Sequence, residues 1–242
     1  MQFTDLPAIT GGKLLALHRD QPVITLITDS RKAVVDEGSV FFAISGTRHD
    51  GHAFIRPLYE AGITQFVVES EFDRKNFPSA NVLKVNSTVN ALQQIAGHHR
   101  QQFSLPVIGI TGSNGKTTTK ELIRSILSQQ FRVLATQGNL NNHIGVPLTL
   151  LEVNEQHEFA IIEMGANHQK EIAQLCEIAL PDYGLVTNVG KAHLEGFGGF
   201  EGVIKGKGEM YDFLKKQGVP QAYLMAGGYS PDCWEVYAAF LE

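Results

Sequence analysis

The first third of the chain carries short apolar runs that are rich in β-branched and aromatic side chains. Their length and composition are typical of strands, which we expect at residues 23–27, 40–44, 65–68 and 82–85. Between the second and third runs, Phe54, Leu58 and Ala61 follow at spacings of four and three, which predicts an apolar helix face over residues 51–61. The pattern therefore predicts a small α/β domain over residues 1–86.

A longer helix is expected to close this domain. Ser87 stands in the position of an N-cap, and Leu92 and Ile95 follow at helical spacing, so residues 87–103 are predicted to be helical. Pro106 then marks the start of the next strand. We therefore expect the boundary near residues 86–105 and a second domain over residues 87–242.

The later apolar runs alternate regularly with helical stretches. Most are uniformly apolar, as expected of strands buried on both faces, and they lie at residues 107–111, 132–136, 159–164, 184–189 and 222–225. Helices are predicted between them at residues 117–130, 168–178 and 200–216. Such alternation predicts a parallel sheet, whose ligands bind beyond the carboxyl ends of the strands. Site residues are therefore expected just after Thr111, Thr136, Met164 and Val189.

Composition narrows the class of protein. The 242 residues are 43% hydrophobic and 19% charged, which is typical of a globular chain. The net charge of −5 argues against nucleic-acid binding by bulk charge. No window reaches the ~18 uncharged apolar residues of a membrane span, and no secretory signal is visible. Cys176 and Cys233 are the only cysteines, so neither a disulfide framework nor a structural zinc site is expected. We expect a soluble, cytoplasmic protein.

A glycine-rich loop follows the predicted strand 107–111 and precedes a helix. Glycines allow successive N–H groups to point toward one anion, and the helix N-terminus adds partial positive charge. Lys116 is placed to reach the β- and γ-phosphates, and the Thr117 hydroxyl to ligate Mg²⁺. The common motif has glycine where this chain has Ile110. We nonetheless predict that a nucleoside triphosphate binds to Thr111, Gly112, Ser113, Asn114, Gly115, Lys116, Thr117 and Thr118.

Further ionisable side chains follow the later strands. Glu163 ends a buried strand, where a carboxylate is costly unless a cation pairs with it, so we expect it to hold Mg²⁺. His193 lies in a glycine-rich loop beyond strand 184–189, where a structural role and a role at the site are equally consistent. Lys205 and Lys207 point about 200° apart on a helix of ~3.6 residues per turn, so only one can face a given site. Spacing alone favours a solvated basic stretch there.

These motifs together resemble the Mur ligases of peptidoglycan synthesis. Besides the phosphate loop, the matching segments are 28–32 (TDSRK), 41–44 (FFAI), 50–52 (DGH), 138–142 (GNLNN), 145–151 (GVPLTLL), 163–168 (EMGANH) and 192–198 (AHLEGFG). Within the family, the runs at 138–142 and 165–168 are most similar to the members that join D-alanyl-D-alanine to UDP-MurNAc-tripeptide. The resemblance implies an α/β fold, with a small amino-terminal UDP-binding domain followed by an incomplete parallel-sheet P-loop ATPase domain.

The resemblance also implies a reaction. ATP phosphorylates the carboxylate that ends the UDP-linked peptide, and the amine of D-alanyl-D-alanine attacks the acyl phosphate. By position, Lys116, His193 and Lys207 are the expected catalytic residues. Thr117 and Glu163 are expected to hold one Mg²⁺, and His193 and a carbamylated Lys207 a second. Substrate is expected at Ser30, Arg31, Asp50, Gly51, His52, Asn139, Asn141 and Asn142.

The chain departs from the family in several ways. It is shorter than the three-domain members, its match weakens after about Val219, and Lys170 stands where the family often has glycine. We expect the chain alone to be a monomer that binds the UDP-sugar peptide and, weakly, ATP, without ligating them. The alternatives are an inactive fragment that only binds nucleotide or UDP-sugar, a Mur ligase for another amino acid, and a folylpolyglutamate-type ligase. The runs at 28–32 and 138–142 argue against the last of these.

Overall fold

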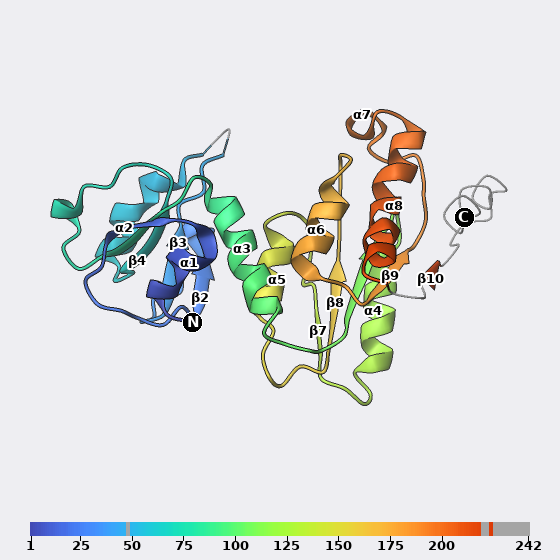
Figure 1. The fold of residues 1–242 in the computed structure, drawn as a ribbon, viewed down its shortest axis with the longest axis horizontal. Coiled ribbons are helices and arrows are strands. Elements are labelled where there is room, and N and C mark those ends of the chain that lie inside the picture. Colours follow the sequence, from blue (N-terminus) through green and yellow to red (C-terminus); the bar gives the residue numbers. More distant parts are fainter. Residues whose placement is uncertain (47–48, 219–222, 225–242) are drawn as a thin grey trace. The chain divides into compact units, whose positions relative to one another are not determined.

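The computed structural model describes residues 1–46, 49–218 and 223–224, the last two by their backbone alone. Of the predicted strand at 222–225, only residues 223–224 lie within the described residues. Cys233 lies outside them. The chain divides into two compact units, Met1–Ile95 and Ala96–Glu242 (Figure 1). The division falls within helix α3 (Thr88–Arg100). Within the described ranges, no helix has both the length and the apolar character needed to cross a bilayer.

The first unit is built on a five-stranded sheet of order β1-β5-β4-β3-β2. Four strands are parallel, and β1 pairs antiparallel with β5. The strands are β1 (Lys13–Ala16), β2 (Thr25–Ile27), β3 (Ser39–Phe42), β4 (Gln65–Val68) and β5 (Asn81–Lys84). The four parallel strands overlap the predicted ones. The edge strand β1 was not predicted, because its four residues show no clear alternation.

Short helical segments precede and connect these strands. They are η1 (Phe3–Asp5), α1 (Leu6–Thr10), η2 (Ser30–Lys32), η3 (Gly51–Phe54), α2 (Ile55–Glu60) and η4 (Arg74–Asn76). The helix predicted at 51–61 therefore starts as a 3₁₀ turn, because Asp50 accepts the N–H of His52 and tightens the first residues. Its apolar face then buries Ile55 and Leu58.

The described part of the second unit contains a parallel sheet of order β10-β9-β6-β8-β7. Its strands are β6 (Val107–Thr111), β7 (Val133–Ala135), β8 (Phe159–Glu163), β9 (Tyr183–Val186) and β10 (Tyr223–Leu224). Its helices are α4 (Lys116–Leu127), α5 (Gly145–Leu151), α6 (Glu171–Ala179), α7 (Leu194–Phe197) and α8 (Phe200–Lys216). The predicted parallel α/β architecture is confirmed.

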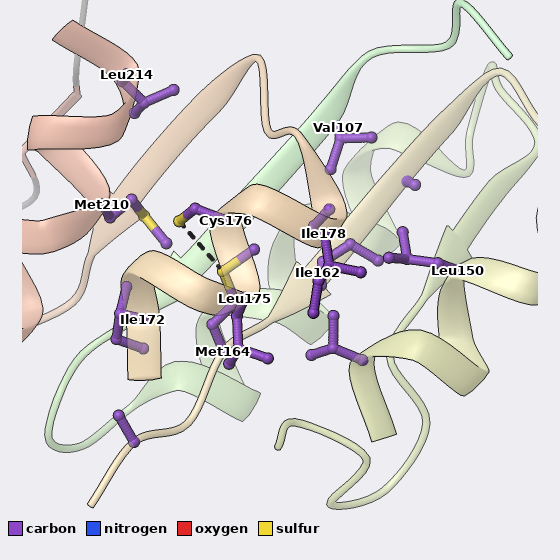
Figure 2. Packing of buried hydrophobic residues seen from close by; sticks show 14 of the residues in the cluster. Val107, Leu150, Ile162, Met164, Ile172, Leu175, Cys176, Ile178, Met210 and Leu214 are labelled. Atoms are coloured by element: carbon purple, nitrogen blue, oxygen red, sulfur yellow. Dashed lines mark hydrogen bonds between the residues drawn. The ribbon is translucent and has the colours of Figure 1, made fainter. Parts of the chain in front are cut away.

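The buried strands of this sheet divide their side chains between two apolar clusters. Val107 and Ile162 pack in the cluster that α5, α6 and α8 cover, whereas Ile110 and Ile161 pack in the cluster beside α4. Figure 2 shows the larger cluster, where the Cys176 thiol lies 3.8 Å from the Met164 sulfur. Burial raises the pKa of this thiol to about 12, so Cys176 is a packing residue.

Candidate active site

The loop between β6 and α4 depends on two glycines. Gly115, with φ of +78°, precedes the first residue of α4, and Gly112 has φ of +139°. A Cβ at Gly112 would lie 2.1 Å from Thr187 Oγ1, so no larger residue fits without movement. The first N–H groups of α4 have no carbonyl within the helix to bond, and the helix dipole adds positive charge there. The backbone thus forms a turn that is suited to bind an anion at the carboxyl end of β6.

Lys116 folds back over this turn. Its Nζ donates to the Gly112 carbonyl at 2.8 Å and lies 3.5 Å from the Ser113 carbonyl. Burial lowers the pKa of Lys116, and the charge of Glu163 partly opposes that shift. The ammonium is therefore partly removed from water and bonded to neutral carbonyls, which a phosphate oxygen can replace with a stronger, charge-assisted bond.

Glu163 ends β8 as a buried carboxylate. Its side chain is 2% exposed, and Oε2 accepts from Thr117 Oγ1 at 2.9 Å. Oε1 accepts from Asn141 Nδ2 at 2.8 Å. The buried ammonium of Lys120 lies 4.0 Å from Oε2 and supplies the nearby positive charge. Thr117 and Glu163, which were expected to share one Mg²⁺, are thus in direct contact, whereas nothing in the sequence pattern singled out Lys120.

The asparagines that follow β7 make different contacts. Asn141 holds Glu163, as described, and its carbonyl accepts the N–H of Gly165 at 2.7 Å. Asn142 Oδ1 accepts the N–H groups of Ile144 and Gly145 at 3.1 and 2.9 Å, so it orders the start of α5. Asn139 is exposed. Asn141 and Asn142, expected at the substrate, are thus also structural supports of the Glu163 carboxylate and of the loop.

Helix α8 places Lys207 in the interior and leaves Lys205 exposed. Glycines make this possible, because a Cβ at Gly206 would lie 2.4 Å from Phe197 Cε1 and one at Gly202 would lie 1.8 Å from the Phe197 carbonyl. Their cost in a helix, about 1 kcal/mol each, is offset by this close packing. The Lys207 ammonium lies 5.3 Å from the centroid of the Phe197 ring. The solvated stretch that spacing alone favoured is therefore wrong for Lys207.

The pKa of Lys207 is lowered to about 8. Burial is the main cause, and the charge of Lys116 lowers it further, while Glu171 and Glu209 raise it. Two lysines of the second unit are therefore close enough to repel each other. An anion between them would relieve that repulsion.

A single cavity of about 390 Å³ gathers most of these groups. Of the predicted residues, it is lined by Gly112, Ser113, Lys116, Asn139, Asn141, Asn142, His193 and Lys207. Glu163 is connected to it through Asn141. The sequence reading missed the part of the wall formed by His143, Asn167, Glu171, Gln174 and Leu175. The signals for these five were their position after β7 and β8 and, for Asn167, the matching segment 163–168.

The same groups suit Mg²⁺ rather than a preassembled metal cage. Within the described ranges, no three His, Cys, Asp or Glu side chains converge in a cluster that could hold a metal ion. Mg²⁺ usually takes one or two carboxylates and completes its shell with waters and substrate phosphates. One buried carboxylate beside a hydroxyl, next to an anion-binding turn, fits that chemistry. His193, exposed at the N-terminus of α7, faces the same cavity.

The predicted residues of the first unit also follow parallel strands. After β2, the Arg31 guanidinium donates to both Asp29 oxygens at 2.9 and 2.7 Å, and these bonds lower the pKa of Asp29 to about 2. The 3₁₀ turn η2 carries Ser30 beside this pair. Arg31 remains 86% exposed, so water and solutes reach its charge.

After β3, His52 links three segments. Its Nε2 accepts the N–H of Glu69 at 3.0 Å, so Nδ1 carries the proton and donates to Asp50 Oδ1 at 2.6 Å. Bonds from the backbone and ring of His52 hold the pKa of Asp50 below its usual range. Gly51 is required here, because a Cβ would lie 2.7 Å from the Ile44 nitrogen. Three of the five predicted residues thus belong to two ordered polar pairs, Asp29 with Arg31 and Asp50 with His52.

Known proteins share these two units. Residues 26–100 match the model for the Mur ligase family, catalytic domain, and residues 110–226 match the Mur ligase middle domain. The UDP-N-acetylmuramoyl-tripeptide–D-alanyl-D-alanine ligase of Bacillus subtilis is 41% identical over 89% of this chain and 47% of its own length. The chain spans about half the length of the curated relatives it matches.

Solved structures agree with this comparison. MurF from Acinetobacter baumannii has a TM-score of 0.84 at 36% identity, covering 98% of this chain and 50% of that one. MurF ligase from Thermotoga maritima, in complex with ADP, has a TM-score of 0.73 at 36% identity, covering 84% of this chain and 45% of that one. The matched segments contain both polar clusters described above. On fold, site and sequence together, the chain belongs to the Mur ligase family.

Proposed function

We propose that the chain supplies the UDP-binding and ATPase units of a ligase that joins D-alanyl-D-alanine to UDP-MurNAc-tripeptide. One observation carries the proposal: a single cavity gathers the anion-binding turn, Lys116, His193 and Lys207. Relatives with that activity in their names are 41% and 42% identical over 89% and 97% of this chain. Phosphoryl transfer to a carboxylate brings two anions together, and positive charge in a shared cavity favours their approach.

In this proposal the turn binds the phosphates of ATP. Lys116 leaves the Gly112 carbonyl for the β- and γ-phosphates, while N–H groups at the start of α4 bond the remaining oxygens. Thr117 and Glu163 hold one Mg²⁺, and His193 and Lys207 a second. Bound Mg²⁺ supplies positive charge between the phosphates and the substrate carboxylate. The carboxylate that ends the peptide lies near Asn139 and Asn142 and takes the γ-phosphoryl group of ATP, which releases ADP. The amine of D-alanyl-D-alanine then attacks the acyl phosphate and loses one proton, so that an amide bond forms and inorganic phosphate leaves.

Lys207 is proposed to act as a carbamate. With its pKa lowered to about 8, a fraction of its amine is neutral at pH 7, and only the neutral amine can add to CO₂. The ammonium first loses one proton, and the neutral amine loses a second when its N–C bond to CO₂ forms, so the side chain changes from a cation to an anion. That change ends the repulsion with Lys116 and provides an oxygen ligand for Mg²⁺.

The first unit is proposed to bind the uridine diphosphate part of the substrate. Arg31 offers an exposed guanidinium, whose fork matches phosphate oxygens as well as it matches Asp29. Ser30, Asp50, Gly51 and His52 lie at the same kind of strand end. The protein is proposed to act in the cytoplasm, as a monomer, because its substrates are nucleotides and both clusters lie in one chain.

Titration calorimetry tests the proposal directly. The 242-residue chain is titrated with Mg·ATP and, separately, with UDP-MurNAc-tripeptide. We expect both to bind, with Lys116→Ala affecting only ATP and Arg31→Ala only the UDP-linked peptide. Binding of neither ligand would support the inactive-remnant alternative. If both ligands bind, phosphate release is measured with a full-length relative that carries these two units. A ligase for another amino acid would be indicated if D-alanyl-D-alanine does not stimulate that release.

A further inference from the structure

The tip of β9 contacts the phosphate loop from the neighbouring strand. Strands β6 and β9 pair in parallel up to Thr111 and Val186, so the residues that follow each strand emerge side by side. We call residues 187–190 the β9 clamp. Gly190 follows Val189, where site residues were expected from the sequence, but no role was predicted for residues 187–190, and the described function does not use them.

The clamp first holds Ser113. The Ser113 N–H donates to the Asn188 carbonyl at 3.1 Å. Its hydroxyl donates to the Gly190 carbonyl at 3.2 Å and accepts the Gly190 N–H at 2.9 Å. Main chain and side chain of Ser113 are therefore both bonded to the clamp.

Asn114, at the tip of the loop, is held at both of its peptide groups. Its N–H donates to Asn188 Oδ1 at 2.9 Å, and its carbonyl accepts from Thr187 Oγ1 at 2.6 Å. Thr187 is only 5% exposed, and its hydroxyl occupies the space that a side chain at Gly112 would need. A buried hydroxyl in that position has no water to replace a lost partner.

We propose that Thr187 and Asn188 are positioning residues that hold the phosphate loop in its anion-binding form before nucleotide arrives. The clamp occupies the N–H groups of Ser113 and Asn114, which leaves the N–H groups of Gly115, Lys116 and Thr117 for phosphate. A loop that is ordered in advance loses less conformational entropy on binding. The clamp also lies three residues before His193, so it joins the loop to the histidine side of the cavity. This inference rests on the proposed nucleotide-binding function.

The test uses inorganic triphosphate with Mg²⁺ as the probe, because it reports on the loop without any contact to a base. Calorimetry on the whole chain compares Thr187→Val, which removes the hydroxyl, with Thr187→Ser, which keeps it. Thr149→Val is the matched control, since Thr149 is 2% exposed and donates to the Gly145 carbonyl within α5. We expect roughly tenfold weaker binding for Thr187→Val and near-normal binding for Thr187→Ser and Thr149→Val.

Asn188→Ala provides a second variant in case Thr187→Val does not fold, and it is also expected to bind roughly tenfold more weakly. Urea unfolding of each variant separates general destabilisation from loss of binding. Triphosphate binding by Thr187→Val and Asn188→Ala within twofold of the unaltered chain, or an equal loss in Thr149→Val, would overturn the clamp alone. Failure of the unaltered chain to bind triphosphate would refute the nucleotide site and the clamp with it.

Discussion

Both units place polar side chains at the carboxyl ends of parallel strands, but they treat charge in opposite ways. In the first unit Asp29 pairs with Arg31, and Asp50 pairs with His52, and most of these side chains are at least partly exposed to water. In the second unit Glu163 and Lys207 are buried, and the charge of Lys116 lowers the pKa of Lys207. The first cluster is internally paired, whereas the second contains cations that repel each other across one cavity.

This difference predicts how much binding free energy each unit would gain per contact with a ligand. A ligand of the first unit has to displace pairs that already satisfy each other, so its net gain per contact is small. An anion in the second unit relieves repulsion between partly desolvated cations, and it does so in a medium of lower dielectric constant. The second unit is therefore expected to respond more strongly to single substitutions.

The largest effect is expected at Lys116. Lys116→Ala should weaken Mg·ATP binding by roughly 100-fold or more, because a charge-assisted contact to two phosphates is lost. Circular dichroism should show an unchanged fold, since the side chain bonds only to loop carbonyls. Calorimetry measures the affinity for Mg·ATP. An affinity within threefold of that of the unaltered chain would contradict phosphate binding by the loop between β6 and α4.

The next largest effect concerns the shape of the loop. Gly112→Ala should lower the free energy of unfolding by about 2–4 kcal/mol, because the new Cβ meets Thr187 Oγ1 and the backbone φ is positive. Gly138→Ala is the matched control, with φ of +53° but no atom within 4 Å of its Cβ. It should cost about 1 kcal/mol from backbone strain alone. Equal losses in urea unfolding would show that the contact with Thr187 does not matter.

An intermediate effect is expected in the pH dependence of stability. The pKa of Lys207 is about 8 in the folded chain and its ordinary value is 10.5, so the folded state binds fewer protons between these values. In CO₂-free buffer, where Lys207 keeps its amine, stability should therefore rise with pH from about 8 to about 10.5, by roughly 1–3 kcal/mol, and most of that rise should disappear in Lys207→Met. Unfolding in urea at several pH values measures it. The same slope in both proteins would contradict the burial of the charged amine.

A smaller effect is expected in the first unit. Arg31→Ala should shift Tm by ~2 °C or less, because exposed ion pairs contribute little to stability. The pKa of Asp29 should rise from about 2 toward its ordinary value of 3.8. Any stability from the pair is therefore present above pH 3.8 and lost as pH falls toward 2. A large fall in Tm at neutral pH would show that this cluster is structurally as sensitive as the second one.

The smallest effect is expected at Lys170, which precedes α6 with φ of +72°. Lys170→Gly should raise the free energy of unfolding by about 0.5 kcal/mol. Glycine relieves the backbone strain, but its greater freedom in the unfolded chain offsets part of that gain. Thermal unfolding measures it. A clear destabilisation would mean that the Lys170 side chain contributes contacts that outweigh the strain.

The parts that the sequence predicted are those whose cause is local. The turn at 112–115 followed from glycines between an apolar strand and a helix, and Phe200–Lys216 was predicted with its observed ends because its periodicity is long. Strand β1 and helix α5 were not predicted, because short elements depend on their partners in the sheet and core rather than on their own pattern.

The site was less predictable where three-dimensional packing decides. Spacing showed that Lys205 and Lys207 face apart, but only the fit of Phe197 against Gly202 and Gly206 decides which lysine is buried. Lys120 was missed because its partner Glu163 is 43 positions away in sequence and meets it only through the pairing of β6 with β8. Asn188 was missed for the same reason, since its contact with the loop depends on the register of β6 and β9.

The most direct test of the central claim is a crystal structure of the chain with Mn²⁺ and a non-hydrolysable ATP analogue. We expect phosphate density in the turn of residues 112–117 and an anomalous Mn²⁺ peak beside the Thr117 hydroxyl and the Glu163 carboxylate. A turn without phosphate at saturating analogue, or Mn²⁺ bound away from both side chains, would contradict that claim.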